Sequence, residues 1–152
     1  MPLAIELQQE NNSRERKVPE ALPQPIANPD SAPYWQGARE ERLLIRQCQD
    51  CKAFHFMPRF LCPQCWSQNL CWVQATGNAT VHSFTIIRRA PLESFTSRVP
   101  YVVALLDLEE GVRMMSNIVG DDALDTRIGD RVTVCFEDRG DGARIPQFQR
   151  AR

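Results

Sequence analysis

The chain has 152 residues, a formal net charge of −1, 43% hydrophobic residues and 24% charged residues. This length suits one ordinary domain or two very small ones, and the composition is typical of a globular protein. A charge near zero argues against a purely electrostatic binder of nucleic acid or membranes, and the apolar runs, about six residues at most, are too short to span a bilayer.

The start of the sequence, MPLAIELQQENN, lacks a basic stretch followed by an apolar one, so it does not predict a secretory signal. We therefore expect a cytoplasmic, reducing location. In such a compartment the six cysteines indicate a metal site or free thiols sooner than disulfides.

Prolines crowd the N-terminal part of the chain, where six of the eleven lie within the first 33 residues. Proline blocks helices and sheet ladders, so we predict an extended tail over residues 1–30, which is either a disordered arm or an arm that wraps a partner protein. A helix and a lead-in strand are predicted over residues 31–47, with Pro33 in the first helical turn. Tyr34 and Trp35 fall on one side of this helix and can pack on the chain's own body or on a partner.

Four cysteines form the pattern C-x2-C-x10-C-x2-C, which predicts a zinc ribbon over residues 48–73. Two residues between cysteines allow a tight turn to present both sulfurs to one cation, and two such turns complete a tetrahedron. Four thiolates leave no position for water or substrate, so the metal is expected to be structural. Zinc is the leading candidate, and iron in a rubredoxin-like site is the main rival. The proposed ligands are Cys48, Cys51, Cys62 and Cys65.

Aromatic residues surround these cysteines. A ribbon of this size cannot bury enough surface alone, so we expect the metal and the aromatic residues to share its stabilisation. His55 is expected on the surface of the ribbon, and Cys71 and Cys135 are expected to be free thiols. The predicted mini-core consists of Phe54, Phe56, Phe60, Trp66 and Trp72.

The pattern changes to short strands in residues 74–152, where we predict an OB-fold domain. A hairpin turn falls at Glu109–Gly111, and a helical turn fits between the third and fourth strands. Five strands in this arrangement fit an OB-type Greek-key barrel. The predicted fold class is therefore mainly β, with an N-terminal helix, a rubredoxin-like zinc ribbon and a C-terminal OB-fold barrel. The candidate strands are residues 77–89, 100–108, 111–119, 131–138 and 145–149.

The sequence contains no nucleophile-elbow, zinc-protease, P-loop or dinucleotide-binding motif, and His82 lies on a predicted strand beside no obvious nucleophile. We therefore predict no catalytic residue. Sixteen of the eighteen basic residues are arginine, and Arg88, Arg89 and Arg98 flank a long loop without secondary-structure signals. Because forked arginine donors suit phosphates, this loop either contacts an anionic ligand or partner or is simply solvated.

The order of these parts resembles a family of small zinc-ribbon plus OB-fold proteins that associate with acyl-CoA enzymes, long catalogued as a domain of unknown function. The cysteine spacing is shared with many ribbons, whereas the strand sequences make the match more specific. The resemblance covers about residues 33–150, and the proline-rich tail departs from the shorter members. The stretches that carry it are Tyr34–Gly37, Cys48–Cys65, Pro100–Gly120 and Ile128–Glu137.

The resemblance implies a non-catalytic accessory subunit of a thiolase-fold enzyme, which stabilises the partner and helps to shape the acyl-CoA site. The implied reaction is cleavage or formation of a 3-oxoacyl-CoA, an aromatic one such as benzoylsuccinyl-CoA included. Because thiolases are dimers, two small and two thiolase subunits would form a heterotetramer. The implied cofactors are structural Zn²⁺ in this chain and coenzyme A or acyl-CoA in the complex.

Aromatic residues and arginines commonly anchor interfaces, so the candidate contacts with CoA or the partner are Tyr34, Trp35, Arg88, Arg89 and Arg98. One alternative is a subunit of a thiolase-like aldolase or acyltransferase complex. Another is a nucleic-acid-binding module, which needs a basic groove with stacking aromatics that a net charge of −1 does not favour. A stand-alone enzyme would need a nucleophile and base that the sequence does not bring together.

Overall fold

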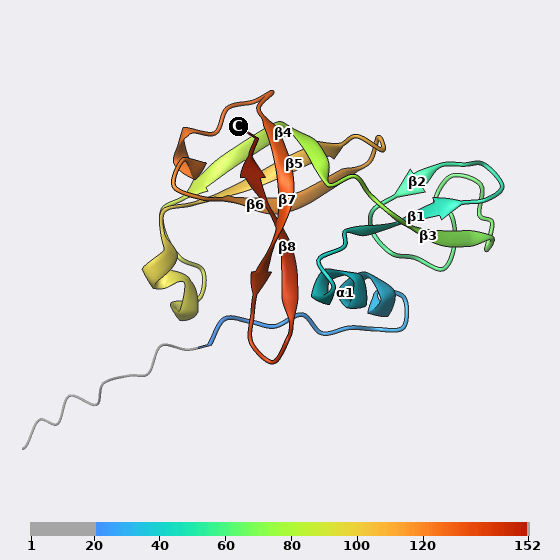
Figure 1. Cartoon of the computed structure of the whole chain (residues 1–152), viewed down its shortest axis with the longest axis horizontal. Helices are drawn as coiled ribbons and strands as arrows, with labels where there is room; N and C mark the ends of the chain where they lie inside the picture. Colours follow the sequence, from blue (N-terminus) through green and yellow to red (C-terminus); the bar gives the residue numbers. More distant parts are fainter. Residues whose placement is uncertain (1–20, 152) are drawn as a thin grey trace, which may run out of the picture.

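The computed structural model describes residues 21–151, so most of the predicted tail lies outside the described part. The chain forms a short helix, then a small sheet, then a barrel (Figure 1). Two 3₁₀ helices, η1 and η2, lie in connections between strands of the barrel. In chain order the elements are α1 Ala32–Arg39, β1 Leu44–Cys48, β2 Phe54–His55, β3 Leu70–Gln74, β4 Asn78–Ile87, η1 Glu93–Arg98, β5 Tyr101–Leu108, β6 Arg113–Val119, η2 Ala123–Asp125, β7 Arg131–Asp138 and β8 Arg144–Arg150.

Helix α1 begins where a local pair of hydrogen bonds ends the preceding extended segment. The amide of Ser31 donates to Asn28 Oδ1 at 2.8 Å, and the amide of Asn28 donates to Ser31 Oγ at 3.0 Å. Proline occupies the first turn, as predicted. Gly37 weakens the helix intrinsically, but a Cβ at this position would lie 2.7 Å from Cγ of Leu44. Glycine therefore allows the helix to pack directly against β1.

The zinc ribbon is built on a three-stranded antiparallel sheet of order β2-β1-β3. Leu44 pairs with Gln74 and Cys48 pairs with Leu70, so the predicted lead-in strand is the central strand of this sheet. The sheet lies beside the barrel, and α1 lies below the connection between them in the view of Figure 1.

The remaining strands close a barrel of order β4-β5-β6-β8-β7. Its neighbours are antiparallel except for β6 and β8, which are parallel and joined at Ile118–Phe148 and Val119–Gln149. Strands are found at all five predicted positions, and η2 supplies the helical turn expected before β7. The predicted mainly β architecture is confirmed.

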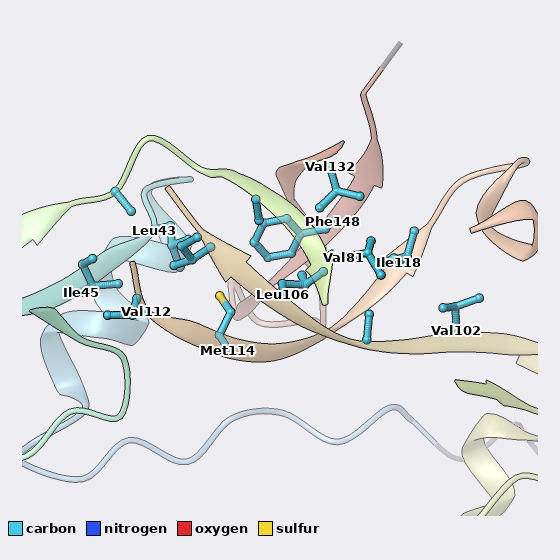
Figure 2. Close-up of a cluster of buried hydrophobic side chains, with 14 of the residues drawn as sticks. Leu43, Ile45, Val81, Val102, Leu106, Val112, Met114, Ile118, Val132 and Phe148 are labelled. Carbon is cyan, nitrogen blue, oxygen red and sulfur yellow. The ribbon is translucent and has the colours of Figure 1, made fainter. Parts of the chain in front are cut away.

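The barrel and the ribbon share one hydrophobic core. Phe148 lies inside the barrel and is fully buried, together with Val81, Leu106 and Ile118 (Figure 2). The same cluster continues through Leu43 and Ile45 of the β1 region and Tyr34 of α1. Full burial of a phenylalanine side chain contributes about 1.5–3 kcal/mol, so a core shared in this way fixes the ribbon against the barrel.

Two further observations complete the fold. The long loop after β4, for which the sequence predicts no secondary structure, contains η1, whose residues are all at least partly exposed. Local propensity misses such short 3₁₀ turns because few hydrogen bonds define them. Within residues 21–151, no helix is both long enough and apolar enough to cross a bilayer.

Candidate metal centre and partner surfaces

The four predicted ligands come together in the structure. The Sγ atoms of Cys48, Cys51, Cys62 and Cys65 all lie within 4.8 Å of one another. Cys48 to Cys65 and Cys51 to Cys62 are each 3.6 Å apart, far beyond the roughly 2.05 Å of a disulfide. Four sulfurs about 2.3 Å from a zinc ion form a tetrahedron with edges of about 3.8 Å. The donor set therefore fits a tetrahedral metal ion.

The turns around the cysteines are shaped to hold thiolates. Backbone N–H groups of Cys51 and then Asp50 lower the pKa of Cys48 to about 6, against the cost of burial. In the second turn the amide of Cys65 has the same effect on Cys62 and lowers its pKa. Deprotonated sulfur is the form that binds metal, so the backbone amides favour the ligand state of Cys48 and Cys62. The pKa of Cys51 and of Cys65 is raised, with burial and the neighbouring thiols among the causes.

Side chains from the first turn also hold the second. Asp50 accepts hydrogen bonds from Ser67 Oγ at 2.5 Å and from Asn69 Nδ2 at 2.9 Å. Lys52 and Trp66, each directly after the second cysteine of its turn, have φ values of 64° and 62°. This left-handed conformation closes both turns in the same way.

The aromatic residues near the metal centre divide into two groups. Phe54, Phe56 and Trp72 pack against the shared core, as predicted for a mini-core. Phe60 and Trp66 are 63% and 74% exposed, so the prediction is wrong for these two residues. The turn directs both rings outward, where they form an apolar surface on the second cysteine turn.

His55 is also not where the sequence placed it. It was expected on the ribbon surface, but it is buried in β2, where it pairs with Arg46 of β1. Burial, followed by the charges of Arg46 and Arg59, lowers the pKa of His55. His55 lines a small pocket together with Gly111 and Val112 of the β5–β6 turn, so residues distant in sequence form part of its surroundings.

His82 belongs to an exposed ionic cluster on the outside of the barrel. Its Nδ1 atom lies 3.1 Å from Asp107 Oδ2 and 3.0 Å from Arg113 Nη2. Arg113 Nε also donates to Asp107 Oδ1 at 2.7 Å, and this hydrogen bond lowers the pKa of Asp107. The cluster links β4, β5 and β6.

A groove of about 470 Å³ lies between α1, the loop after β2 and the barrel strands β6 and β8. Of the predicted aromatic pair, Tyr34 is 7% exposed and packs edge-on against Phe56. Trp35 is half-buried and lines the groove. The full lining is Asn28, Ser31, Tyr34, Trp35, Phe56, Met57, Pro58, Met114, Met115, Ser116, Asn117, Ile145, Pro146 and Gln147.

The predicted arginines lie elsewhere. Arg88 and Arg89 follow β4 and are exposed, and none of the three arginines lines the groove. Arg98 ends η1 and forms an ion pair with Glu137 of β7. Glu137 also accepts from Arg139 and from Gln147, so it ties the loop to the barrel. The structure thus separates the aromatic pair from the arginines.

Family models match the two modules in order. Residues 35–70 match the rubredoxin-like zinc ribbon domain of ChsH2, and residues 72–137 match the C-terminal OB-fold domain of ChsH2. Together with the four cysteines, these matches support a structural Zn²⁺ in the ribbon.

Individual relatives agree with the models. A "DUF35 domain-containing scaffold protein" of Methanocaldococcus jannaschii is 32% identical over 114 residues, which cover 71% of this chain and 80% of the relative. A solved chain described as "Ltp2-ChsH2(DUF35) aldolase" superposes with a TM-score of 0.76 and 32% identity, over 85% of this chain and 100% of that chain.

A longer relative is the "Probable enoyl-CoA hydratase alpha subunit" of Thermomonospora curvata, 39% identical over 103 residues, or 67% of this chain. The match covers only 32% of that relative, so this chain corresponds to about a third of its length. Both modules match the family models in the same order, and the chain is 32% identical in sequence to a relative of similar size. The chain belongs to the DUF35 family of zinc-ribbon and OB-fold proteins.

Proposed function

We propose that this chain is a non-catalytic scaffold subunit of an enzyme complex that acts on acyl-CoA thioesters. The observation that carries the proposal is the combination of a closed four-cysteine shell with family relatives named as scaffold proteins and as subunits of acyl-CoA enzymes. A shell of four thiolates leaves no position at which a substrate could meet the metal. The chemistry is then supplied by the partner.

Zinc bound by Cys48, Cys51, Cys62 and Cys65 would act as a cross-link between two turns and supply no chemistry to the reaction. The chain's own residues do the rest: backbone amides favour the thiolate forms of Cys48 and Cys62, and Asp50 joins the two turns. The rigid ribbon can then present Phe60 and Trp66 to a partner. Exposed aromatic residues of this kind are typical anchors of protein interfaces.

A thiolase-fold protein is the proposed partner, in a heterotetramer with two copies of each chain. In this complex Trp35, Arg88 and Arg89 are the proposed contacts with the partner or with CoA phosphates, since all three are at least partly exposed. Tyr34 supports Trp35 from inside, with their ring centroids 4.8 Å apart. Arg98 acts by holding η1 in place through Glu137.

A hydratase partner is the second candidate. Relatives in Thermomonospora curvata and Mycobacterium tuberculosis are named as CoA hydratase alpha subunits, and this chain matches about a third of each. In those proteins the matched region is therefore joined to additional sequence in one chain. We propose that the two modules of this chain serve the same kind of enzyme.

The test is purification of the chain with its native partner, followed by assay of each component alone and together. We expect the partner to be an acyl-CoA enzyme whose activity or stability falls when this chain is removed. A thiolase and a hydratase are distinguished by thiolysis of a 3-oxoacyl-CoA against hydration of an enoyl-CoA. An acyl-CoA enzyme that neither co-elutes with this chain nor responds to its removal would contradict the proposal.

A further inference from the structure

The barrel is open along part of one seam. Strands β6 and β8 are paired only at Ile118 and Val119 of β6. Residues 113–117 of β6 are paired with β5 on one side, and within residues 21–151 no strand is paired with them on the other. The groove described above lies along this open edge, because Met115 and Asn117 are among its lining residues.

The direction of the backbone groups follows from the antiparallel pattern. The amide of Leu108 donates to the carbonyl of Val112 at 2.9 Å, which makes these two residues a hydrogen-bonded pair. Hydrogen-bonded pairs recur every second residue, so Met114 and Ser116 bond to β5. Met115 therefore directs its N–H and C=O groups away from β5, into the groove. Asn117 directs its N–H the same way, whereas its C=O faces the N–H of Phe148 at the start of the parallel pairing with β8.

The facing strand cannot use these groups. On β8, the amide of Arg139 donates to the carbonyl of Ala143, so these two residues form a hydrogen-bonded pair of the β7–β8 ladder. Counting in steps of two from this pair, Pro146 lies at a position that does not bond to β7, and its backbone faces the groove. Proline has no N–H, and its carbonyl already accepts a hydrogen bond from Ser116 Oγ at 2.9 Å. Among the residues that line the groove, those of β6 thus offer the free strand edge and Pro146 of β8 does not.

The lining of the groove indicates the charge and polarity of the molecule that can bind there. None of its lining residues is charged, although 24% of the chain is. Its walls include Met57 and Met115, which are 61% and 66% exposed, together with Trp35. An uncharged, largely apolar occupant complements such a surface, whereas the phosphates of a nucleotide do not.

We propose that the groove binds an extended, uncharged segment of the partner enzyme, which adds to β6 as an extra strand. This inference rests on the proposed function, because it requires the partner subunit. The N–H and C=O of Met115 and the N–H of Asn117 supply the main-chain hydrogen bonds, and the methionine and tryptophan walls receive alternate apolar side chains.

Hydrogen exchange on the co-purified complex tests the pairing directly. The amides of Met115 and Asn117 should exchange rapidly in the free chain and roughly a hundredfold more slowly in the complex. The amides of Met114 and Ser116, which already bond to β5, serve as the internal reference. A complex in which Met115 and Asn117 exchange as fast as in the free chain would overturn this inference and leave the scaffold function intact.

A pair of variants isolates the backbone contribution. Met115→Pro removes an N–H that the barrel does not use, whereas Met115→Ala removes only the side chain. If both fold with similar midpoints, the proline variant should bind the partner about tenfold more weakly than the alanine variant, as for loss of one hydrogen bond. Equal affinities would overturn the pairing. If the proline variant does not fold, the exchange experiment decides.

The other occupants give different results. Slow exchange at Met115 in the free full chain that disappears on deletion of residues 1–20 would assign the groove to the chain's own segment. Slow exchange that depends on concentration without partner would assign it to a second copy. Either result overturns the proposal, and failure to isolate any acyl-CoA enzyme complex overturns both the proposal and the function on which it rests.

Discussion

The ribbon and the barrel are each stabilised by a different kind of interaction. In the barrel, strand β5 buries Val102, Ala104, Leu106 and Leu108 on one face. In the ribbon, β3 has no fully buried residue, β2 has only two residues, and β1 buries one aliphatic side chain, Ile45. The barrel can therefore be stabilised by apolar burial, whereas the ribbon needs four sulfurs around a metal. This difference predicts that the two regions respond to different perturbations.

The largest effect is expected from loss of a metal ligand. Cys62→Ser should abolish metal binding and unfold the ribbon, because on the order of 10 kcal/mol of binding free energy supports a site of this kind. Metal content by atomic absorption and thermal unfolding check this result. Cys71→Ser is the matched control, since its Sγ accepts a hydrogen bond from Gln49 outside the four-sulfur cluster. Full thermal stability of a metal-free Cys62→Ser chain would refute the assignment.

A core substitution should act on the barrel instead. Phe148→Ala should lower the free energy of unfolding by about 3–5 kcal/mol, measured in urea, while the folded fraction keeps its metal. Phe60→Ala, at a ring that is 63% exposed, should change it by less than about 0.5 kcal/mol. Equal losses for the two phenylalanines would contradict the division between core and surface.

A smaller effect is expected on the exposed side of the barrel. The double change Arg88→Ala and Arg89→Ala should raise KM for the acyl-CoA in the complex about tenfold with little change in kcat. This result is expected when the substrate and the transition state lose the same amount of binding free energy. Arg127→Ala, another exposed arginine, provides the control. An unaltered KM would remove the arginines from the proposed site and leave the scaffold function untouched.

The smallest effect is expected for His82. His82→Ala removes a side chain from an exposed cluster with Asp107 and Arg113, so the complex should keep its activity within a few-fold. A thousandfold loss of kcat, about 4 kcal/mol of transition-state stabilisation, would make His82 a catalytic residue instead.

The sequence predicts the two regions unequally well, for physical reasons. The strands of the barrel follow from alternation, as in β5, where alternate residues are buried. The cysteine turns follow from their spacing, because two intervening residues suffice to direct both sulfurs to one point. These are local patterns that the printed sequence contains.

The errors concern side chains whose environment is set by distant residues. His55 is buried, and Gly111 and Val112 of the β5–β6 turn line the pocket beside it, which no pattern near residue 55 indicates. Phe60 and Trp66 were expected inside from their residue type, but the turn after Cys65 directs Trp66 outward. The open edge of β6 depends on how far β8 pairs across the barrel, so it also required the structure.

The boundary between the two matched modules falls at residues 70–72, but the apolar cluster crosses it. Leu43 and Ile45 on the ribbon side belong to the same buried cluster as Phe148 on the barrel side. A chimera that joins this ribbon to a foreign barrel would therefore carry two mismatched halves of one interior. Modules of this kind should be inherited as a pair, and volume changes on one side should be matched by opposite changes on the other.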